Sequence, residues 1–294
     1  MPEATLHDAS VIPVEVHGSG PAVLLPVNPQ PIDGPQAEAM RQWGADPALG
    51  RSLIDGLKDA FQVVAFDYEG HVLGVPKPDT LTPANVVDDF LAVAGTVGAD
   101  RFAYYGYSWL GLCGLQLAIR TERLTALVMG GYPPIDGPYA EMLRVTTATY
   151  EMSTQTRPAT QPTPAEQRAP ATDETASEDF DWSTVEVTMS EPQTRQFMTL
   201  YRALEDFDDR AFQTRIGCPR LCFAGSADVM DYDERWGGVR VRIVTPLVGR
   251  RAELEGLGWD VRVLDGLDHT QAMQSTNVLP VLRPWLLSKL GSNR

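Results

Sequence analysis

Short apolar runs alternate with longer segments of helical periodicity along most of the chain. Residues 50–60 place their leucine and isoleucine residues on one helical face, and the β-rich run 61–66 follows directly. Thr82 and Pro83 form a typical helix start, because threonine caps free N–H groups and proline fits the first turn. Apolar residues then recur at helical intervals as far as Val97. This alternation predicts a parallel sheet with helices on both faces.

The same alternation of strand-like and helix-like runs continues in the middle of the chain. Residues 102–105 and 124–129 are short apolar runs typical of buried strands, and residues 109–119 between them are apolar nearly all round, as in a buried helix. Near the start, two β-rich runs at 11–16 and 22–25 flank a glycine-containing turn. We therefore expect the sheet to open with an antiparallel hairpin.

The alternation is interrupted once, at residues 132–217. This stretch has two helix-like segments around a Pro-, Thr- and Glu-rich region, residues 154–184, which we expect to be a mobile solvated loop. Strands and helices then resume at 220–224, 246–257, 259–264 and 278–290. We expect one doubly wound, mostly parallel α/β domain, residues 1–131 and 218–294, with 132–217 inserted as a helical lid over the strand ends.

Charge and cysteine content narrow the function classes. The 294 residues carry a formal net charge of -15 and no basic stripe, so we expect no nucleic acid and no membrane surface as partner. The first ten residues lack a targeting pattern, and no run is long enough to span a bilayer, which predicts a cytoplasmic protein. Cys113, Cys218 and Cys222 fit neither a disulfide framework nor a metal site, so we expect no metal.

A candidate nucleophile stands between a predicted strand and a predicted helix. The sequence there is Gly106-Tyr107-Ser108-Trp109-Leu110-Gly111. A serine in such a strand-to-helix turn is typical of the nucleophile elbow G-x-S-x-G, in which small residues let the two backbones approach closely. The second glycine comes one residue late, at Gly111, with Leu110 in its place.

At this motif the chain resembles the α/β-hydrolase superfamily, and within it the capped serine hydrolases. The resemblance runs from about residue 11 to residue 290 and implies the chain order serine, acid, histidine. Gly225-Ser226-Ala227-Asp228 follows a predicted strand as the family's acid loop does, which makes Asp228 the acid; Asp231 on the same loop is the alternative. Asp265-Gly266-Leu267-Asp268-His269 is similar to the final loop of the family and makes His269 the base.

These three residues would supply one complete chemistry. A serine hydroxyl needs an imidazole to accept its proton, and the imidazole needs a carboxylate to orient it. The resemblance also implies an oxyanion hole built from the amide of Trp109 and, after the third strand, the amide of Asn28. There the family's usual His-Gly pair is replaced by Pro26-Val27.

A second loop departs from the family in the same way. Asp67-Tyr68-Glu69-Gly70-His71 resembles the loop after the fourth strand, where arginine usually precedes the glycine, and Glu69 stands in its place. For substrate contacts we expect an aromatic wall around the serine and the base of the lid, formed by Tyr107, Tyr132, Tyr139 and Met142.

The leading hypothesis is therefore a serine hydrolase that acts on a small-molecule ester, lactone or related carbonyl compound, without a cofactor. The alternative keeps the fold and the triad for acyl transfer, C–C cleavage, elimination or cyclisation, since fold alone does not separate these reactions. A third hypothesis is a non-catalytic ligand-binding protein, against which the intact triad argues. A homo-oligomer is compatible with the sequence.

Overall fold

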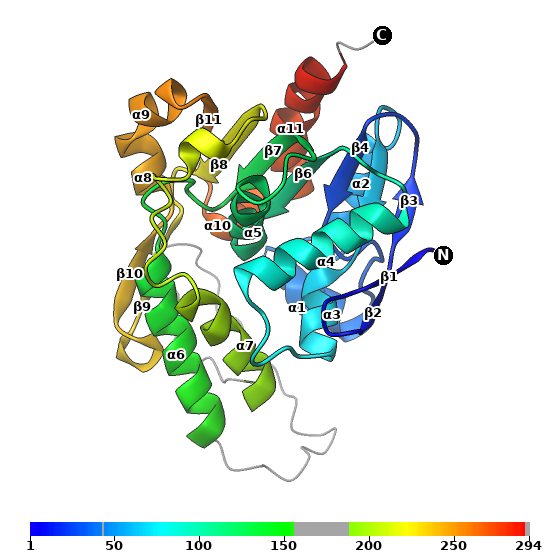
Figure 1. Cartoon of the computed structure of the whole chain (residues 1–294). Helices are drawn as coiled ribbons and strands as arrows, with labels where there is room; N and C mark the ends of the chain where they lie inside the picture. Colours follow the sequence, from blue (N-terminus) through cyan, green and yellow to red (C-terminus); the bar gives the residue numbers. More distant parts are fainter. Residues whose placement is uncertain (43, 156–187, 292–294) are drawn as a thin grey trace.

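The computed structural model describes residues 1–42, 44–155 and 188–291 (Figure 1). A seven-stranded sheet forms its centre, in the order β11-β8-β7-β6-β4-β5-β3. Its strands are β3 (Glu15–His17), β4 (Ala22–Leu25), β5 (Gln62–Ala65), β6 (Phe102–Tyr107), β7 (Leu124–Gly130), β8 (Arg220–Gly225) and β11 (Trp259–Leu264). All neighbouring pairs are parallel except β3 with β5. The predicted doubly wound, mostly parallel sheet is confirmed.

Helices cover both faces of this sheet, and each face has its own apolar core. Strand residues alternate between the two: Leu24 packs with one cluster, while Val23 and Leu25 pack with the other. The first cluster includes α4 (Pro83–Thr96), α5 (Trp109–Ala118), α8 (Val244–Gly249) and α9 (Arg251–Gly256). The second includes α2 (Leu49–Leu57), α10 (His269–Met273) and α11 (Ser275–Leu290). Parallel strands thus end at one common edge, between two helical layers.

The predicted opening hairpin is wrong. β3 pairs with one side of β5 and β4 with the other, so β5 separates them. The turn between them does not fold back, because it packs on the chain that leads into β5. Gly18 and Gly20 both have positive φ. A Cβ on Gly18 would lie 2.0 Å from the Lys58 carbonyl oxygen, and a Cβ on Gly20 would lie 2.8 Å from the Ala60 carbonyl oxygen. The antiparallel hairpin is instead formed by β1 (Glu3–Thr5) and β2 (Val11–Pro13), outside the main sheet.

Two further elements differ from the sequence expectation. The single helix expected at 246–257 is two, α8 and α9, because Arg250 leaves helical geometry at φ -110°, ψ 14°. Residues just after β8 form a second hairpin, β9 (Val229–Tyr232) with β10 (Val239–Arg242), which the sequence pattern did not reveal.

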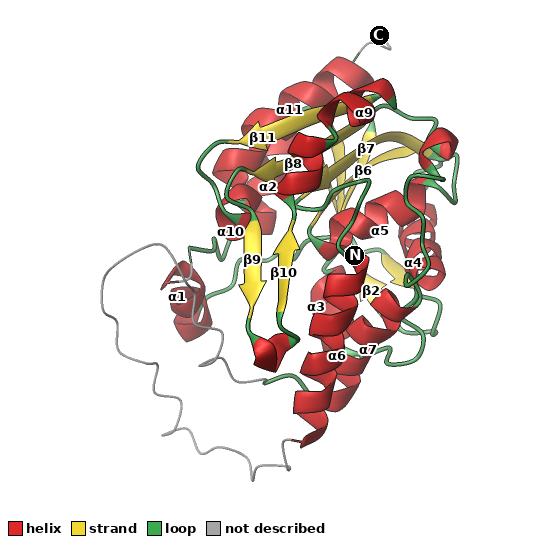
Figure 2. Cartoon of the chain, turned by 90° about the vertical axis from the view of Figure 1, so that its left-hand side faces the viewer, coloured by secondary structure: helices red, strands yellow, loops and turns green. Residues whose placement is uncertain are grey.

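Two helices, α6 (Tyr139–Gln155) and α7 (Glu191–Arg202), come from the predicted insertion and pack against each other (Figure 2). α6 also contacts the β9–β10 hairpin. α7 is tied to the core by Gln196, whose amide donates to the Val72 carbonyl at 3.0 Å and accepts from the Lys77 backbone at 3.0 Å. The loop expected at 154–184 lies almost entirely outside the described residues. The remaining short elements are α1 (Gly34–Gln42), α3 (Tyr68–Gly74), η2 (Gln213–Arg215) and η3 (Glu234–Trp236).

Candidate active site

Ser108 occupies a strained turn between β6 and α5. Its backbone has φ 56° and ψ -131°, in a region that residues with a side chain seldom adopt and that costs about 1–3 kcal/mol. The turn is held because the Ser108 N–H donates to the Gly130 carbonyl at 2.8 Å and the Ser108 carbonyl accepts from Gly111 at 2.8 Å. The side chain of Ser108 is therefore presented at the strand end, as a nucleophile elbow requires.

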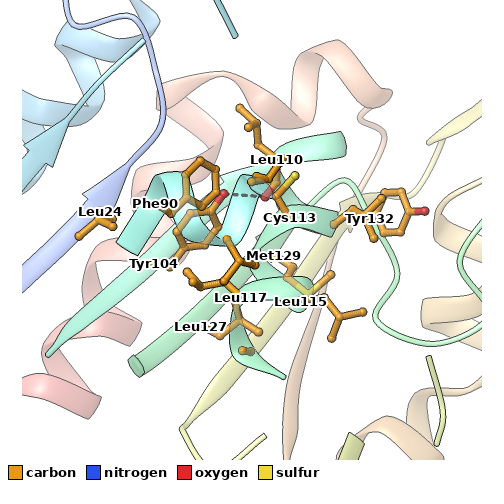
Figure 3. Packing of buried hydrophobic residues seen from close by; sticks show 14 of the residues in the cluster. Leu24, Phe90, Tyr104, Leu110, Cys113, Leu115, Leu117, Leu127, Met129 and Tyr132 are labelled. Atoms are coloured by element: carbon orange, nitrogen blue, oxygen red, sulfur yellow. Dashed lines mark hydrogen bonds between the residues drawn. The ribbon is translucent and has the colours of Figure 1, made fainter. Parts of the chain in front are cut away.

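The late second glycine has a structural explanation. A Cβ on Gly111 would lie 3.0 Å from the Gly130 carbonyl oxygen and 3.3 Å from that of Gly106, so Gly111 helps α5 to pack closely on the sheet. Leu110 contacts β6 through its backbone: its carbonyl accepts a 2.7 Å hydrogen bond from the Tyr104 hydroxyl (Figure 3). A leucine is therefore compatible with the elbow at this position.

His269 lies opposite the serine. Its Nε2 is 3.1 Å from Ser108 Oγ, and its side chain is 21% exposed, so the ring is reachable from outside. Asp268 caps α10 in a reciprocal capping box with Gln271, and His269 is the first helical residue. The Tyr107 hydroxyl donates to the His269 carbonyl at 2.8 Å. Burial raises the pKa of Tyr107, which keeps this phenol protonated as the donor.

Asp228 completes the set. Its two carboxylate oxygens lie 3.0 and 2.9 Å from His269 Nδ1, and its side chain is fully buried. Asp231, the alternative acid, is exposed on β9 and forms an ion pair with Arg240 at 3.3 Å. The structure thus brings Asp228 to the histidine and places Asp231 elsewhere. Residues far apart in sequence meet here because β6, β8 and β11 all end at this edge.

The two expected oxyanion donors remain available. In the described part of the chain, neither the Trp109 nor the Asn28 backbone N–H donates to another protein group. Trp109 begins α5, where helix N–H groups have no intrahelical acceptor. The Asn28 side chain turns into its own loop and accepts from the Gln30 N–H at 2.9 Å. Its carbonyl packs on α2, where a Cβ at Gly50 would lie only 2.0 Å away.

The four predicted substrate contacts have different surroundings. The hydroxyl of Tyr107 is already used to hold the His269 loop. Tyr132 and Tyr139 are buried, 2% and 8% exposed, with ring centroids 6.0 Å apart. Met142 on α6 is half-buried against the larger core cluster. Contact of these residues with substrate stays a prediction.

One site residue was missed by the sequence reasoning. Gly131 follows β7 with φ +60°, and a Cβ there would lie 2.9 Å from the Cε1 of His269 and 2.6 Å from the Tyr107 ring. The glycine therefore makes room for the His269 imidazole. The pair Gly130-Gly131 at a strand end was the available signal, since consecutive glycines mark a close backbone approach or a positive φ.

A recess lies away from the triad, between α6 and the turn 234–237. Residues that line it include Leu143, Arg144, Glu151 and Glu234, and it includes none of the triad residues. It offers no nucleophile beside a base, so the triad is the better candidate site. No three His, Cys, Asp or Glu side chains gather as metal ligands within the ranges that the structure describes. Within those ranges, no helix has the length and apolar character needed to cross a membrane.

Comparison with known proteins bears on the fold. No family model matches the chain. One curated relative, a protein of Rhizobium rhizogenes assigned as the carbamate hydrolase RutD, is 30% identical over 97 residues. That match spans 32% of this chain and 37% of the relative, so it covers little more than a third of the relative's length.

Solved structures resemble the chain over nearly its whole length. They include an esterase from Thermogutta terrifontis (TM-score 0.60, 15% identity, 98% of both chains) and the enol-lactonase from Burkholderia xenovorans (TM-score 0.57, 16% identity, 99% of this chain and 100% of that one). The bottromycin epimerase BotH also matches (TM-score 0.53, 17% identity, 98% of both chains). At these identities the likeness establishes the fold: the chain has the α/β-hydrolase fold.

Proposed function

We propose that this chain, which has the α/β-hydrolase fold, is a serine hydrolase that acts on a small-molecule ester, lactone or related acyl compound. The observation that carries the proposal is the continuous set of contacts from Ser108 through His269 to Asp228 at the strand ends. By their names, the proteins compared above that are hydrolases act on esters, an enol lactone and a carbamate. All three substrate classes contain an acyl carbon bonded to a heteroatom leaving group.

The first half of the reaction acylates the enzyme. Ser108 Oγ attacks the acyl carbon while His269 Nε2 accepts the hydroxyl proton, and the carbonyl electron pair moves onto oxygen. Asp228 accepts the Nδ1–H of His269 and stabilises the imidazolium that forms. When the tetrahedral intermediate collapses, the bond to the leaving oxygen breaks and His269 returns the proton to it. The alcohol leaves and Ser108 carries the acyl group.

The second half releases the acid. Water attacks the acyl-enzyme while His269 accepts its proton, and the ester bond to Ser108 Oγ then breaks with return of that proton to the serine. In both halves the negative oxygen is placed against the backbone N–H groups of Trp109 and Asn28. These donors need no rearrangement, because neither has another acceptor among the described residues.

Burst kinetics with p-nitrophenyl acetate and p-nitrophenyl butyrate test the proposal. The expected result is one equivalent of p-nitrophenol released quickly, followed by steady turnover with release of the free acid. Both phases should be absent in Ser108→Ala. Thr80→Ala is the matched control, because Thr80 is a hydroxyl residue that also contacts a histidine, and it should keep both phases.

Two outcomes would change the assignment. A burst without steady turnover, restored when an alcohol or amine is added, would indicate acyl transfer in place of hydrolysis. Release that is unchanged in Ser108→Ala would contradict the proposed nucleophile.

A further inference from the structure

The indole ring of Trp109 is held between two elements outside its own helix. Its centroid lies 6.1 Å from that of Tyr68 on α3 and 5.5 Å from that of Phe197 on α7, and the Trp109 and Phe197 rings are nearly perpendicular, at 83°. α3 follows β5 of the central sheet, whereas α7 belongs to the predicted insertion. Trp109 and Phe197 are both half-buried. The residue that follows Ser108 thus contacts the insertion through its side chain.

The backbone beside this ring is strained. Ser108 has φ 56° and ψ -131°, and such geometry persists only where the surroundings hold it. The N–H of Trp109, one of the two proposed oxyanion donors, turns when either the ψ angle of Ser108 or the φ angle of Trp109 changes. Unless those changes cancel, they also displace the Trp109 side chain. A fixed indole therefore restrains the direction of this N–H, which has to be held within about 0.5 Å of its working position.

α7 is itself bound to the core by polar side chains. Three of its residues form hydrogen bonds with backbone groups of residues 72–78, which comprise the last turn of α3 and the loop after it. The fully buried amide of Gln196 both donates and accepts there at 3.0 Å, while Gln193 donates at 2.7 Å and Thr199 at 2.6 Å. Phe197 is adjacent to Gln196, so these bonds fix the distance from its ring to the core.

We propose that Phe197 is a positioning residue: it fixes the Trp109 indole from the side of the insertion and so keeps the Trp109 N–H directed at the oxyanion. Gln196 supports it by holding α7 on the core. Phe197 acts through Trp109 and makes no contact with the reacting atoms. This inference rests on the serine hydrolase proposed above and gives α7 of the insertion a part in its chemistry.

Steady-state kinetics on p-nitrophenyl butyrate tests the role of Phe197. Because acylation and deacylation use the same oxyanion donors, Phe197→Ala should lower kcat about tenfold and leave KM within about twofold. Phe197→Leu, which keeps an apolar side chain against the indole, should retain most of kcat. Phe212→Ala is the matched control: Phe212 is also half-buried and stacks on Phe207 at 5.3 Å, in the segment after α7. An unchanged kcat in Phe197→Ala, or an equal loss in Phe212→Ala, would overturn the proposal.

A tetrahedral adduct reports on the oxyanion donors directly. When Ser108 Oγ adds to the carbonyl carbon of an aliphatic trifluoromethyl ketone, its proton passes to His269 and the carbonyl oxygen becomes negatively charged. The inhibition constant of this ketone should rise about tenfold in Phe197→Ala, in parallel with the fall in kcat, and stay unchanged in Phe212→Ala. A lower kcat with an unchanged inhibition constant would show that Phe197 does not act on the oxyanion donor.

Fluorine NMR of protein labelled with 5-fluorotryptophan separates this inference from the proposed function, because it needs no turnover. The Trp109 signal is the one missing in Trp109→Phe. Gln196→Leu keeps the Phe197 ring but loosens α7, so it should shift or broaden that signal. Gln213→Leu is the matched control and should leave the signal unchanged, since Gln213 is an equally buried glutamine that bonds to the Trp259 indole at the start of β11.

The two proposals can then fail separately. A changed Trp109 signal in Gln196→Leu, in a protein whose wild type turns over no ester, would contradict the hydrolase and keep the link from α7 to Trp109. Ester turnover by the wild type, with an unchanged Trp109 signal in Gln196→Leu, would contradict the link and keep the hydrolase.

Discussion

Two histidines in this molecule, His269 and His7, have nearly the same partners. His269 Nδ1 lies 2.9 Å from Asp228 and its Nε2 lies 3.1 Å from Ser108 Oγ. His7 Nδ1 lies 3.0 Å from Asp89 and its Nε2 lies 3.0 Å from Thr80 Oγ1. Both carboxylates are fully buried. The distances among hydroxyl, imidazole and carboxylate therefore occur twice and do not by themselves identify a catalytic site.

The difference lies in what surrounds each set. Asp89 also accepts the Tyr68 hydroxyl and the His7 backbone N–H, both at 2.7 Å, so it binds the N-terminal segment to the core. Thr80 has no strained backbone, whereas Ser108 is held at φ 56° beside two available N–H groups. Catalysis needs a presented nucleophile and oxyanion donors in addition to the triad distances. We therefore propose a structural role for the His7 site and a catalytic role for the His269 site.

The largest contrast should come from removing the hydroxyl or the imidazole at each site. Ser108→Ala and His269→Ala should each lower kcat/KM on the order of a thousandfold to a millionfold, because they remove the nucleophile or its base. Thr80→Ala and His7→Ala should stay within about twofold of wild type. Steady-state kinetics on one p-nitrophenyl ester measures all four. A comparable loss in His7→Ala would remove the distinction between the two sites.

Replacing Asp228 should lower activity, whereas replacing Asp89 should lower stability. Asp228→Asn should lower kcat on the order of ten-thousandfold, because the amide no longer favours the productive histidine tautomer. Asp89→Asn should leave kcat nearly unchanged and lower the free energy of unfolding by about 3 kcal/mol, because three donors lose a buried anionic acceptor. Kinetics and urea unfolding of both variants would show this crossed pattern. A large loss of kcat in Asp89→Asn, with a loss of stability alone in Asp228→Asn, would contradict these roles.

A pH series tests how Asp8, next to His7, stabilises the N-terminal part of the chain. Burial acts to raise the pKa of Asp8, but hydrogen bonds from the buried Lys77 and from Ser10 outweigh it and hold that pKa well below its ordinary value. A depressed carboxyl pKa contributes stability above the unfolded value of 3.8, and that stability is lost as pH falls toward the folded value.

Asp8→Asn should therefore lower the free energy of unfolding by about 2 kcal/mol at pH 7, because it leaves Lys77 buried without its anion. The deficit should shrink below about pH 4, where the unfolded wild-type chain takes up a proton on Asp8 while the folded protein keeps this carboxyl ionised. Urea unfolding at several pH values checks both statements. A deficit that stays constant down to pH 3 would contradict the ion-pair explanation.

The smallest expected effect concerns the room left for His269. Gly131→Ala should lower kcat/KM by about tenfold or more, since the new methyl would press on the imidazole. Gly98→Ala is the matched control: Gly98 has φ +67° with no atom within 4 Å of an added Cβ. Both variants should lose about 1 kcal/mol of stability from the left-handed backbone. Equal kinetics for the two would show that Gly131 does not position His269.

Much of the proposed site follows from local sequence context. Ser108 stands between a clear strand pattern and a clear helix pattern, and Asp228 and His269 each follow a strand run, so their common edge could be predicted. The pairing of β3 with β5 could not, because the short run 15–17 suits either neighbour, and the approach of the Gly18 turn to the Lys58 carbonyl is not visible in the sequence. The second histidine site was also hidden, since His7 and Asp89 are 82 residues apart and neither lies in a motif.

Covalent labelling with a small fluorophosphonate tests whether Ser108 is the activated hydroxyl of this molecule. The reagent reacts with an activated serine or threonine, so intact-mass analysis followed by peptide mapping compares Ser108 and Thr80 in one experiment. We expect a single adduct on Ser108 that is absent in Ser108→Ala and in His269→Ala and unchanged in His7→Ala. No adduct, or an adduct on Thr80, would contradict it.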